Sequence, residues 1–248
     1  MTQSNVIFII ENFIKNANVK AVTINTRFNA LMVFLTWASD SDRNYIPYQK
    51  YTKKYRTRNV GIIKDPYSVD EYKKIIKYLS IKSKDEEFSL FIQFLWETGS
   101  RCGEALNIKI KDIDHQNNYI KIQNKIFKGQ QEVLLLTDSA IKVVSKLIEL
   151  AKMKGNENLF SFNRKDYLKK KLIDTDKALG NKIEGRGFHG FRRAFCDRLF
   201  DSGLEITMVQ EVMRHKDIQT TLSHYKSWNK VKTREKMNEK LILLEEKK

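Results

Sequence analysis

The sequence predicts a mainly α-helical protein that carries a small three-stranded antiparallel sheet. The chain of 248 residues contains only 10 glycines and 2 prolines, which leaves few obligatory turns and argues against an all-β fold. Apolar residues recur at helical spacing along most of the chain, whereas they form three short strand-like runs between residues 108 and 136. The expected order is therefore helices, sheet, helices.

Two amphipathic helices are expected within the first forty residues. Apolar side chains recur at helical spacing in each of them, at Ile7, Ile10, Phe13 and Ile14 and then at Phe28, Leu31, Met32, Leu35 and Trp37. Thr23 is the expected N-cap of the second helix, because a hydroxyl oxygen can accept a hydrogen bond from an unpaired N–H of the first turn.

A basic segment over residues 43–64 marks the expected domain boundary. It contains seven Lys or Arg residues, no acidic residue and four tyrosines. Two interpretations stay open for this composition, a solvated linker or a strap that follows a DNA backbone. We expect a short helical domain plus the basic linker over residues 1–60 and a second domain over residues 61–248.

The second domain is expected to begin with two helices. Ser68 and Glu71 form a capping box for a helix through Leu79, and residues 88–98 form a strongly apolar, buried helix. The three strand runs follow at residues 108–113, 119–122 and 133–136, with turns at residues 116–118 and 128–129. Helices resume at residues 138–153 and continue to the C-terminus, with breaks near residues 155, 180–187 and 201–203.

The net charge of the chain points to a polyanionic partner. The 46 Lys+Arg residues against 30 Asp+Glu residues give a formal charge of +16. Nucleic acid is the partner that we expect, although ribosomal, RNA-binding and membrane-surface proteins share this excess of positive charge. The apolar runs at residues 6–10 and 88–96 are shorter than the ~20 residues of a membrane span. With no signal peptide at the N-terminus either, the expected location is the cytoplasm, with no membrane partner.

The two cysteines give no sign of a disulfide framework or a zinc site. Cys102 and Cys196 lie far apart, and neither belongs to a C-x-x-C pair. We expect both to be small buried residues. The sequence also lacks a cluster of His, Cys or carboxylate residues at metal-ligand spacing, so no metal is expected.

Three segments of the sequence resemble the motifs of the tyrosine recombinase family, the site-specific integrases and resolvases. Residues 98–106 (TGSRCGEAL) resemble its T-G-x-R-x-x-E-x-L box, residues 188–195 (FHGFRRAF) its H-x-x-R box, and residues 212–225 its histidine followed by a tyrosine. The three segments occur in the family's order and bracket the expected sheet. The resemblance covers about residues 66–230 and implies that family's catalytic-domain fold, preceded by a short helical DNA-clamping domain.

The resemblance implies a role for each of five residues. Tyr225 would attack a DNA phosphodiester and form a 3′-phosphotyrosyl intermediate, which conserves the bond energy for rejoining. Arg101 and Arg192 would bind the phosphate with planar guanidinium groups. His189 and His215 would donate hydrogen bonds to the same phosphate, and His189 would also assist proton transfer at Tyr225.

A lysine would complete this site as the general acid that protonates the leaving 5′-oxygen. Lys128 fits that role because the Lys128-Gly129 pair marks the turn between the second and third strands, and Lys125 is the competitor. With cationic residues in these roles, neither a metal nor a nucleotide cofactor is implied. Glu104 is expected to support the arginines, and His224 is expected to have no role.

Each residue also has an ordinary structural alternative. Arg101 could cap the preceding helix, His189 could be a helix N-cap, and Tyr225 could be a core aromatic residue. The sequence departs from the family pattern at Arg193, where a histidine is common, and at Met213-Arg214, where Leu-Gly is common.

The expected function is site-specific DNA cleavage and rejoining, as integration, excision or resolution. A non-catalytic DNA-binding regulator of the same fold and a type I topoisomerase-like enzyme are the alternatives. The expected partner is double-stranded DNA. The apolar C-terminal run at residues 241–244 either folds back on its own domain or, as the resemblance favours, contacts a neighbouring protomer in a tetramer on paired DNA sites.

Overall fold

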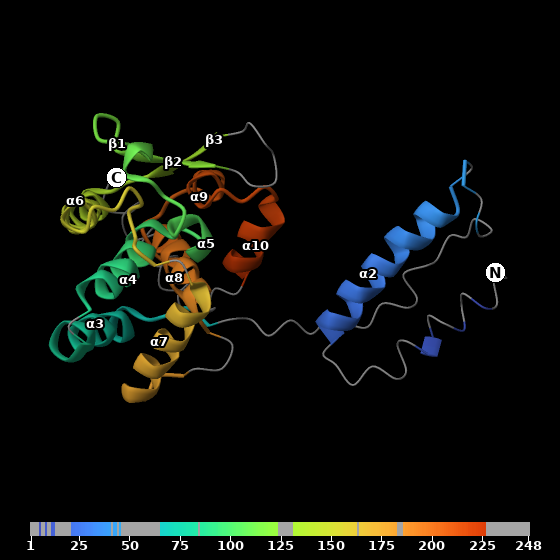
Figure 1. Cartoon of the computed structure of the whole chain (residues 1–248), viewed down its shortest axis with the longest axis horizontal. Coiled ribbons are helices and arrows are strands. Elements are labelled where there is room, and N and C mark those ends of the chain that lie inside the picture. Colours follow the sequence, from blue (N-terminus) through green and yellow to red (C-terminus); the bar gives the residue numbers. More distant parts are fainter. Residues whose placement is uncertain are drawn as a thin grey trace, which may run out of the picture. The chain divides into compact units, whose positions relative to one another are not determined.

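The computed structural model divides the chain into two compact units, residues 1–63 and 64–248 (Figure 1). It describes residues 5, 8, 11–12, 21–40, 42–43, 45, 65–83, 85–123, 131–162, 164–182 and 186–226. Several predictions from the sequence fall outside these ranges, namely those for Lys125, Lys128, most of the first helix, residues 46–64 of the basic segment and the C-terminal run.

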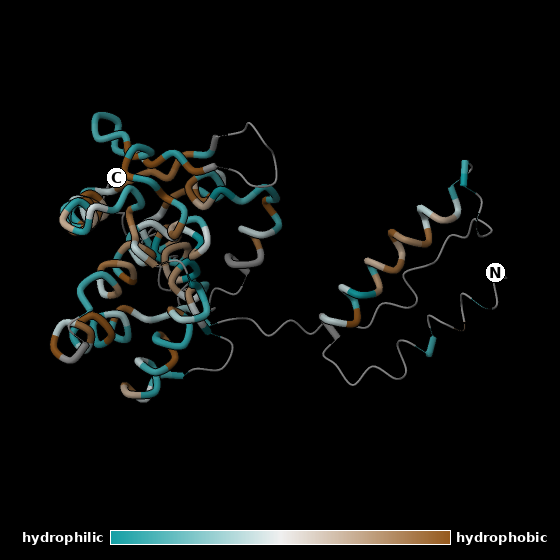
Figure 2. The backbone as a smooth tube through the Cα atoms, in the orientation of Figure 1, coloured by the Kyte–Doolittle hydropathy of each residue, from teal (hydrophilic) through white to brown (hydrophobic). Residues whose placement is uncertain are grey.

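The first unit contains helix α2, Ala21–Ala38. Phe28 and Leu35 are buried as expected, together with Ile24 and Ala38, at helical spacing. Leu31 and Met32 are only partly buried, and the expectation that Trp37 lies on the apolar face is wrong, because its side chain is exposed. Hydrophobic residues continue along much of the helix (Figure 2). The expectation that Thr23 caps this helix is wrong. Thr23 lies inside the helix, whose first described residue is Ala21, so the N–H and the side chain of Thr23 are not at a helix start.

The second unit opens with two helices that the sequence predicted. Helix α3, Val69–Tyr78, begins at the predicted capping box, in which the Ser68 side chain accepts from the Glu71 N–H and the Glu71 side chain accepts from the Ser68 N–H. A π-helical turn, Leu79–Ser83, follows. Helix α4, Glu86–Thr98, begins two residues before the predicted start because the Asp85 side chain accepts from the Phe88 N–H.

The sheet has three antiparallel strands in the order β1-β2-β3. Their bounds are Ile113–Asp114 for β1, Tyr119–Gln123 for β2 and Gln131–Leu135 for β3. The expectation of a first strand that starts at Ile108 is wrong. Asp112 accepts a hydrogen bond from the Lys109 N–H at 3.0 Å beside a 3₁₀ turn over Ile110–Asp112, so strand pairing begins only at Ile113.

Helices follow the sheet in the described part of the chain, and glycines separate several of them. They are α6, Asp138–Met153; α7, Lys165–Ala178; α8, Phe188–Asp201; α9, Ile206–Met213; and α10, Ile218–Lys226. The predicted breaks are confirmed by glycines with positive φ at 155, 180, 187 and 203. Among the residues that the structure describes, no helix has the length and apolarity needed to cross a membrane.

Helix α4 is buried, as its apolar sequence predicted, and it lies at the centre of the core. Ten of its side chains are buried, and it packs against α6 and α8. The Phe91 ring makes edge contacts with the rings of Phe160 and Phe188, at centroid distances of 5.1 and 5.5 Å. Packing on several sides fixes α4 in place, so the segment that leaves its C-terminal end has a rigid support.

Candidate active site

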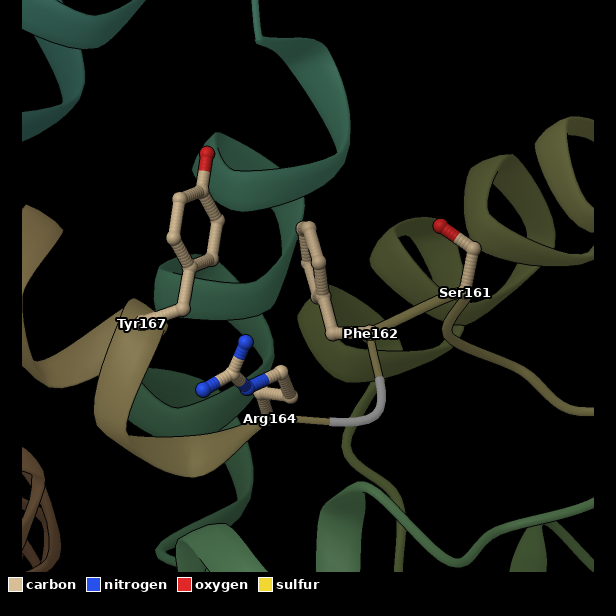
Figure 3. A pocket seen from close by; sticks show the side chains of 4 residues that line it. All are labelled: Ser161, Phe162, Arg164 and Tyr167. Atoms are coloured by element: carbon tan, nitrogen blue, oxygen red, sulfur yellow. The ribbon is translucent and has the colours of Figure 1, made fainter.

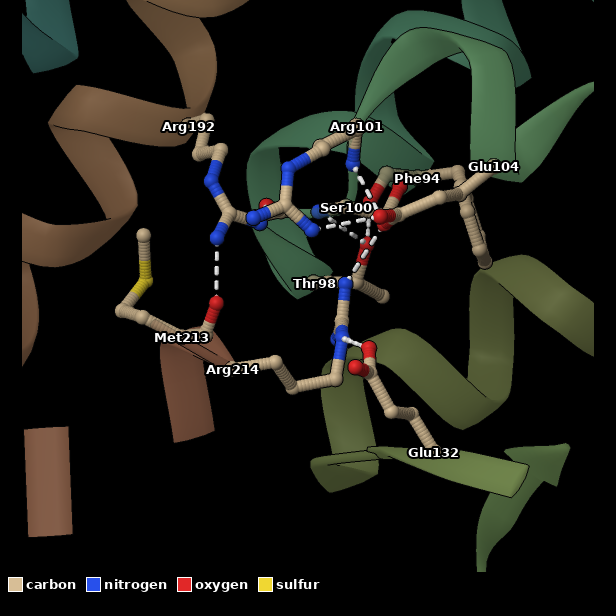
Figure 4. A network of polar contacts seen from close by, with 10 residues as sticks. Phe94, Thr98, Ser100, Arg101, Glu104, Glu132, Arg192, Met213 and Arg214 are labelled. Carbon is tan, nitrogen blue, oxygen red and sulfur yellow. Dashed lines mark hydrogen bonds and ion pairs between the residues drawn. The ribbon is translucent and has the colours of Figure 1, made fainter. Parts of the chain in front are cut away.

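One cavity of the second unit is lined by residues that the sequence did not single out. It has a volume of about 230 Å³ and is lined by Ser161, Phe162, Arg164 and Tyr167 (Figure 3). None of the predicted catalytic residues lines it. The candidate site is instead the cluster of charged side chains at the C-terminal end of α4 (Figure 4).

The chain leaves α4 through a turn that requires glycine at position 99. Gly99 caps the helix with φ 59°, in the left-handed region. A Cβ atom at this position would lie only 2.4 Å from the Phe195 ring on α8. This close contact brings the segment that carries Arg101 against α8, which carries Arg192. The alternative that Arg101 caps α4 is wrong, because Gly99 occupies that position.

Arg101 is anchored by Glu104 of helix α5, Cys102–Ala105. The Arg101 Nη1 atom lies 2.5 Å from Glu104 Oε1, and the Arg101 backbone N–H donates to Glu104 Oε2 at 3.1 Å. The Arg101 side chain is still 45% exposed, so it is anchored and open to solvent at once. The expectation that Glu104 supports the arginines is confirmed for Arg101, whereas Arg192 donates to backbone carbonyls instead.

Arg192 is buried and connects two segments that are distant in the sequence. Only 3% of the residue is exposed. Its Nη1 donates to the Gly99 carbonyl at 2.7 Å, and its Nη2 donates to the Met213 carbonyl at the end of α9 (Figure 4). Burial, followed by the charges of Arg101 and Arg214, lowers the pKa of Arg192 to about 9. The other two guanidinium groups are therefore close enough to disfavour a third positive charge.

Arg214 is part of this cluster, although the sequence motifs do not place it there. Its side chain is 6% exposed, and its Nη2 donates to Glu104 Oε2 at 2.7 Å. Its Nε lies 3.6 Å from Oε2 of Glu132 on β3. Burial raises the pKa of Glu104, but the charges and hydrogen bonds of Arg214 and Arg101 outweigh it and hold this pKa below its ordinary value. Glu104 is therefore ionised and shared between two arginines.

The sequence draws attention to Arg214 in one way only: it stands immediately before His215, where the family pattern commonly has glycine. Neither that departure nor the spacing reveals the partners Glu104 and Glu132, which lie far away along the chain. Three guanidinium groups face two carboxylates in this cluster, which leaves an excess of positive charge. Such an arrangement suits a bound anion, and planar guanidinium groups suit the oxygens of a phosphate.

His215 is held on the loop that follows α9. Its Nδ1 lies 2.9 Å from the hydroxyl of Thr221, a fully buried residue of α10. Its backbone N–H donates to the Gln210 carbonyl, and the Gln210 side chain donates to the His215 carbonyl, both at 3.0 Å. These contacts fix the backbone and the ring of His215 one residue after Arg214.

His189 lies in the first turn of α8 and is exposed. The alternative that it caps this helix is wrong, because Gly187 is the N-cap. Its neighbours are held against Tyr67: the Phe191 ring stacks on the Tyr67 ring at 4.2 Å, and a Cβ atom at Gly190 would lie 2.8 Å from it. The first turn of α8 is therefore closely packed beneath His189.

The backbone of Tyr225 lies in α10, which packs against α8 and α9 (Figure 1). The side chains of Tyr225 and His224 lie outside the described part of the structure, as do Lys128 and Lys125 in the segment between β2 and β3. The structure thus brings together Arg101 and Arg192, places His215 beside α10, and places His189 on the helix of Arg192. Both cysteines are buried and unpaired, as expected. The described residues hold no group of three His, Cys, Asp or Glu side chains that could bind a metal ion.

Residues 67–231, more than half of the chain, match the phage integrase family. The chain belongs to this family. It is 29% identical over 208 residues to the tyrosine recombinase XerA of Saccharolobus solfataricus, across 84% of this chain and 64% of that protein. It is 28% identical over 174 residues to the tyrosine recombinase XerD of Rickettsia prowazekii, across 62% of this chain and 56% of that protein. The chain therefore spans less than two thirds of the length of these curated relatives.

Solved structures of an integrase and a recombinase share the fold of this chain. The Tn1549 transposon integrase in complex with circular intermediate DNA superposes with a TM-score of 0.70 at 18% identity, over 96% of this chain and 85% of that chain. The XerA recombinase superposes with a TM-score of 0.60 at 18% identity, over 95% and 90%. The predicted fold, mainly helical with a small three-stranded antiparallel sheet, is confirmed.

Proposed function

We propose that this protein cleaves and rejoins DNA strands at specific sites through a covalent 3′-phosphotyrosyl link to Tyr225. The observation that carries the proposal is the charged cluster at the end of α4, where Arg101 and Arg192 lie close together beside the loop that leads to α10. Membership of the phage integrase family supports the same reaction.

In this mechanism Arg101 and Arg192 stabilise the negative charge that develops on the phosphate as Tyr225 attacks. Arg192 is already fixed by the Gly99 and Met213 carbonyls, so it needs little reorganisation during the reaction. His189 and His215 donate hydrogen bonds to the phosphate oxygens, and His189 assists removal of the tyrosine proton. Lys128 protonates the leaving 5′-oxygen. The phosphotyrosyl bond retains the energy of the cleaved phosphodiester, so rejoining needs neither a nucleotide nor a metal cofactor.

A suicide DNA substrate tests this function directly. We expect the full chain to form a covalent protein–DNA adduct in the presence of a chelator, because the arginines supply the positive field. A Tyr225→Phe variant should form none, while the matched variant Tyr167→Phe, at an exposed tyrosine beside the separate cavity, should form it normally. DNA binding without any adduct would favour the non-catalytic regulator. An adduct that requires added magnesium would contradict the assignment of the cations.

Double-stranded DNA is the proposed partner, and the cytoplasm is the proposed location. The charge of +16 supports a polyanionic partner, and the Tn1549 integrase, which shares this fold, has been solved in complex with DNA. Residues 1–60 would act as a short DNA clamp with a basic linker, and residues 61–248 would carry out catalysis. In this arrangement the linker crosses the DNA and contacts phosphates without reading bases.

Neutralising Lys53, Lys54, Arg56 and Arg58 together tests the role of the linker. We expect binding to weaken equally on cognate and random DNA. The dependence of affinity on salt should become less steep, by about 0.9 in the log–log slope for each phosphate that the variant no longer neutralises. Titrations at several salt concentrations measure both effects. A drop in affinity confined to the cognate site would show that the segment reads bases instead.

The proposed active assembly is a tetramer on paired DNA sites, in which the C-terminal segment of each protomer contacts its neighbour. The sequence from Val231 onward carries apolar residues at Met237, Leu241 and Leu244 that need a surface to cover them. Truncation after Lys230 should keep single-site binding and abolish synapsis, as measured by gel mobility of paired-site complexes. Unfolding of the truncated protein, or normal synapsis at the wild-type concentration, would contradict contact between the C-terminal segment and the neighbouring protomer.

A further inference from the structure

Arg214 combines a backbone conformation that favours glycine with a buried charged side chain. The residue follows α9 at φ 53° and ψ 46°, in the left-handed region. A side chain with a Cβ atom is strained there, and glycine is the usual residue at this point of a helix end. Strain of this kind persists where the surrounding structure uses the side chain, and it concentrates at functional sites.

The guanidinium group of Arg214 is incompletely paired inside the protein. It contacts Glu104 at 2.7 Å and Glu132 at 3.6 Å, from two different elements (Figure 4). Its Nε and Nη1 atoms are buried and have no hydrogen-bond acceptor among the described residues. Burying such donors is unfavourable. Backbone strain and the burial of unpaired donors both make arginine unfavourable for stability at this position. We therefore look for a role of the Arg214–Glu104 contact in the function of the site.

That contact determines how Glu104 is presented to Arg101. Glu104 Oε2 accepts from Arg214 and from the Arg101 backbone, which leaves Oε1 for the Arg101 guanidinium at 2.5 Å. The terminal torsion of a glutamate is broad when nothing holds it. Arg101 is half-exposed, and its guanidinium forms its ion pair with Glu104. The direction of the Arg101 guanidinium therefore depends on the carboxylate that Arg214 holds.

We propose that Arg214 is a positioning residue for strand cleavage, which holds Glu104 so that Arg101 stays aimed at the scissile phosphate. The inference rests on the proposed function, because it concerns the same phosphate. Arg214 acts without contact to the DNA, through the sequence of contacts from Arg214 to Glu104 to Arg101. The shorter distance to Glu104 than to Glu132 makes Glu104 the more important partner.

Single-turnover cleavage of the suicide substrate by Arg214 variants tests this role. Arg214→Gly suits the backbone and removes the contact, so cleavage should slow by about tenfold or more while duplex affinity stays within about twofold. Arg214→Lys keeps one charge near Glu104 and should recover part of the rate. Melting curves show whether each variant is folded. If Arg214→Gly does not fold, the cleavage rate of Arg214→Lys is compared with that of the wild type instead. Wild-type rates in both folded variants would overturn the inference.

A double-mutant cycle separates positioning from a merely structural role. In an Arg101→Ala background, followed over hours, Arg214→Gly should change the residual rate by less than about twofold, because its effect passes through Arg101. The same tenfold reduction in both backgrounds would overturn the inference. Glu132→Gln leaves the Glu104 contact in place and should cleave within about threefold of the wild-type rate. If it reproduces the tenfold reduction, the hairpin and not Arg101 is what Arg214 holds.

Adduct formation by the wild-type protein shows whether a negative result contradicts this inference or the proposed function on which it rests. If the wild type forms no adduct, the proposed function fails, and the inference fails with it. If the wild type cleaves and the Arg214 effect is absent or independent of Arg101, only the inference fails.

Discussion

Replacement of Arg192 with alanine is expected to slow DNA cleavage by about three orders of magnitude and to destabilise the fold at the same time. The rate falls because a fixed guanidinium group no longer stabilises the charge on the phosphate. The free energy of unfolding falls by about 2 kcal/mol or more because the Gly99 and Met213 carbonyls lose a charged donor inside the protein. Single-turnover cleavage and thermal melting measure the two effects. Duplex affinity should change little, since the wider basic surface dominates it.

Arg198 provides a matched control on the same helix. It donates to the Trp96 carbonyl at 3.0 Å and lies over the Trp96 ring, so it too connects α8 to α4. Arg198→Ala should destabilise the protein without a comparable reduction of the cleavage rate at temperatures where it is folded. If both variants slow only in proportion to their decrease in stability, Arg192 has a structural role alone.

Replacement of Lys128 with alanine is expected to slow cleavage by about 10²- to 10³-fold, the usual contribution of a positioned general acid. A substrate whose leaving 5′-oxygen is replaced by sulfur should restore the rate, because a thiolate leaves without a proton. Cleavage rates of the variant on the oxygen and sulfur substrates measure this rescue.

Lys125→Ala is the control for this assignment, since Lys125 lies in the same segment between β2 and β3. It should cleave the oxygen substrate at nearly the wild-type rate. Rescue by sulfur in Lys125→Ala and not in Lys128→Ala would move the general acid to Lys125. An equal reduction on both substrates for both variants would contradict a general acid in this segment.

Local patterns in the sequence were sufficient to predict most of the helices. The capping box at Ser68 and Glu71 and the apolar run of α4 depend on neighbours within a few residues, and both are confirmed. The first strand could not be predicted in the same way. Its two residues pair with β2 from Ile113 onward. The apolar alternation before Ile113 predicted a strand, but those residues form a turn in which Asp112 accepts from the Lys109 N–H.

The motifs identified some residues of the charged cluster, but they indicated neither Arg214 nor Glu132, nor the contacts within the cluster. The motifs identified Arg101, Arg192 and His215, yet nothing local shows that Arg192 donates to a carbonyl 93 residues away. The ion pair between Arg214 and Glu104 joins residues 110 positions apart. Tertiary packing of α4, α8 and α9 creates both contacts. Local spacing therefore identifies Arg101 and Arg192, but neither Arg214 nor the network that holds these residues.

The site of covalent attachment on the trapped protein–DNA adduct tests the proposed reaction most directly. After nuclease and trypsin digestion, mass spectrometry should find a nucleotide joined through its 3′-phosphate to the peptide of residues 217–226, which contains Tyr225 as its only tyrosine. The modification should be absent from Tyr225→Phe. A nucleotide on another residue, or one joined through a 5′-phosphate, would contradict the proposed mechanism.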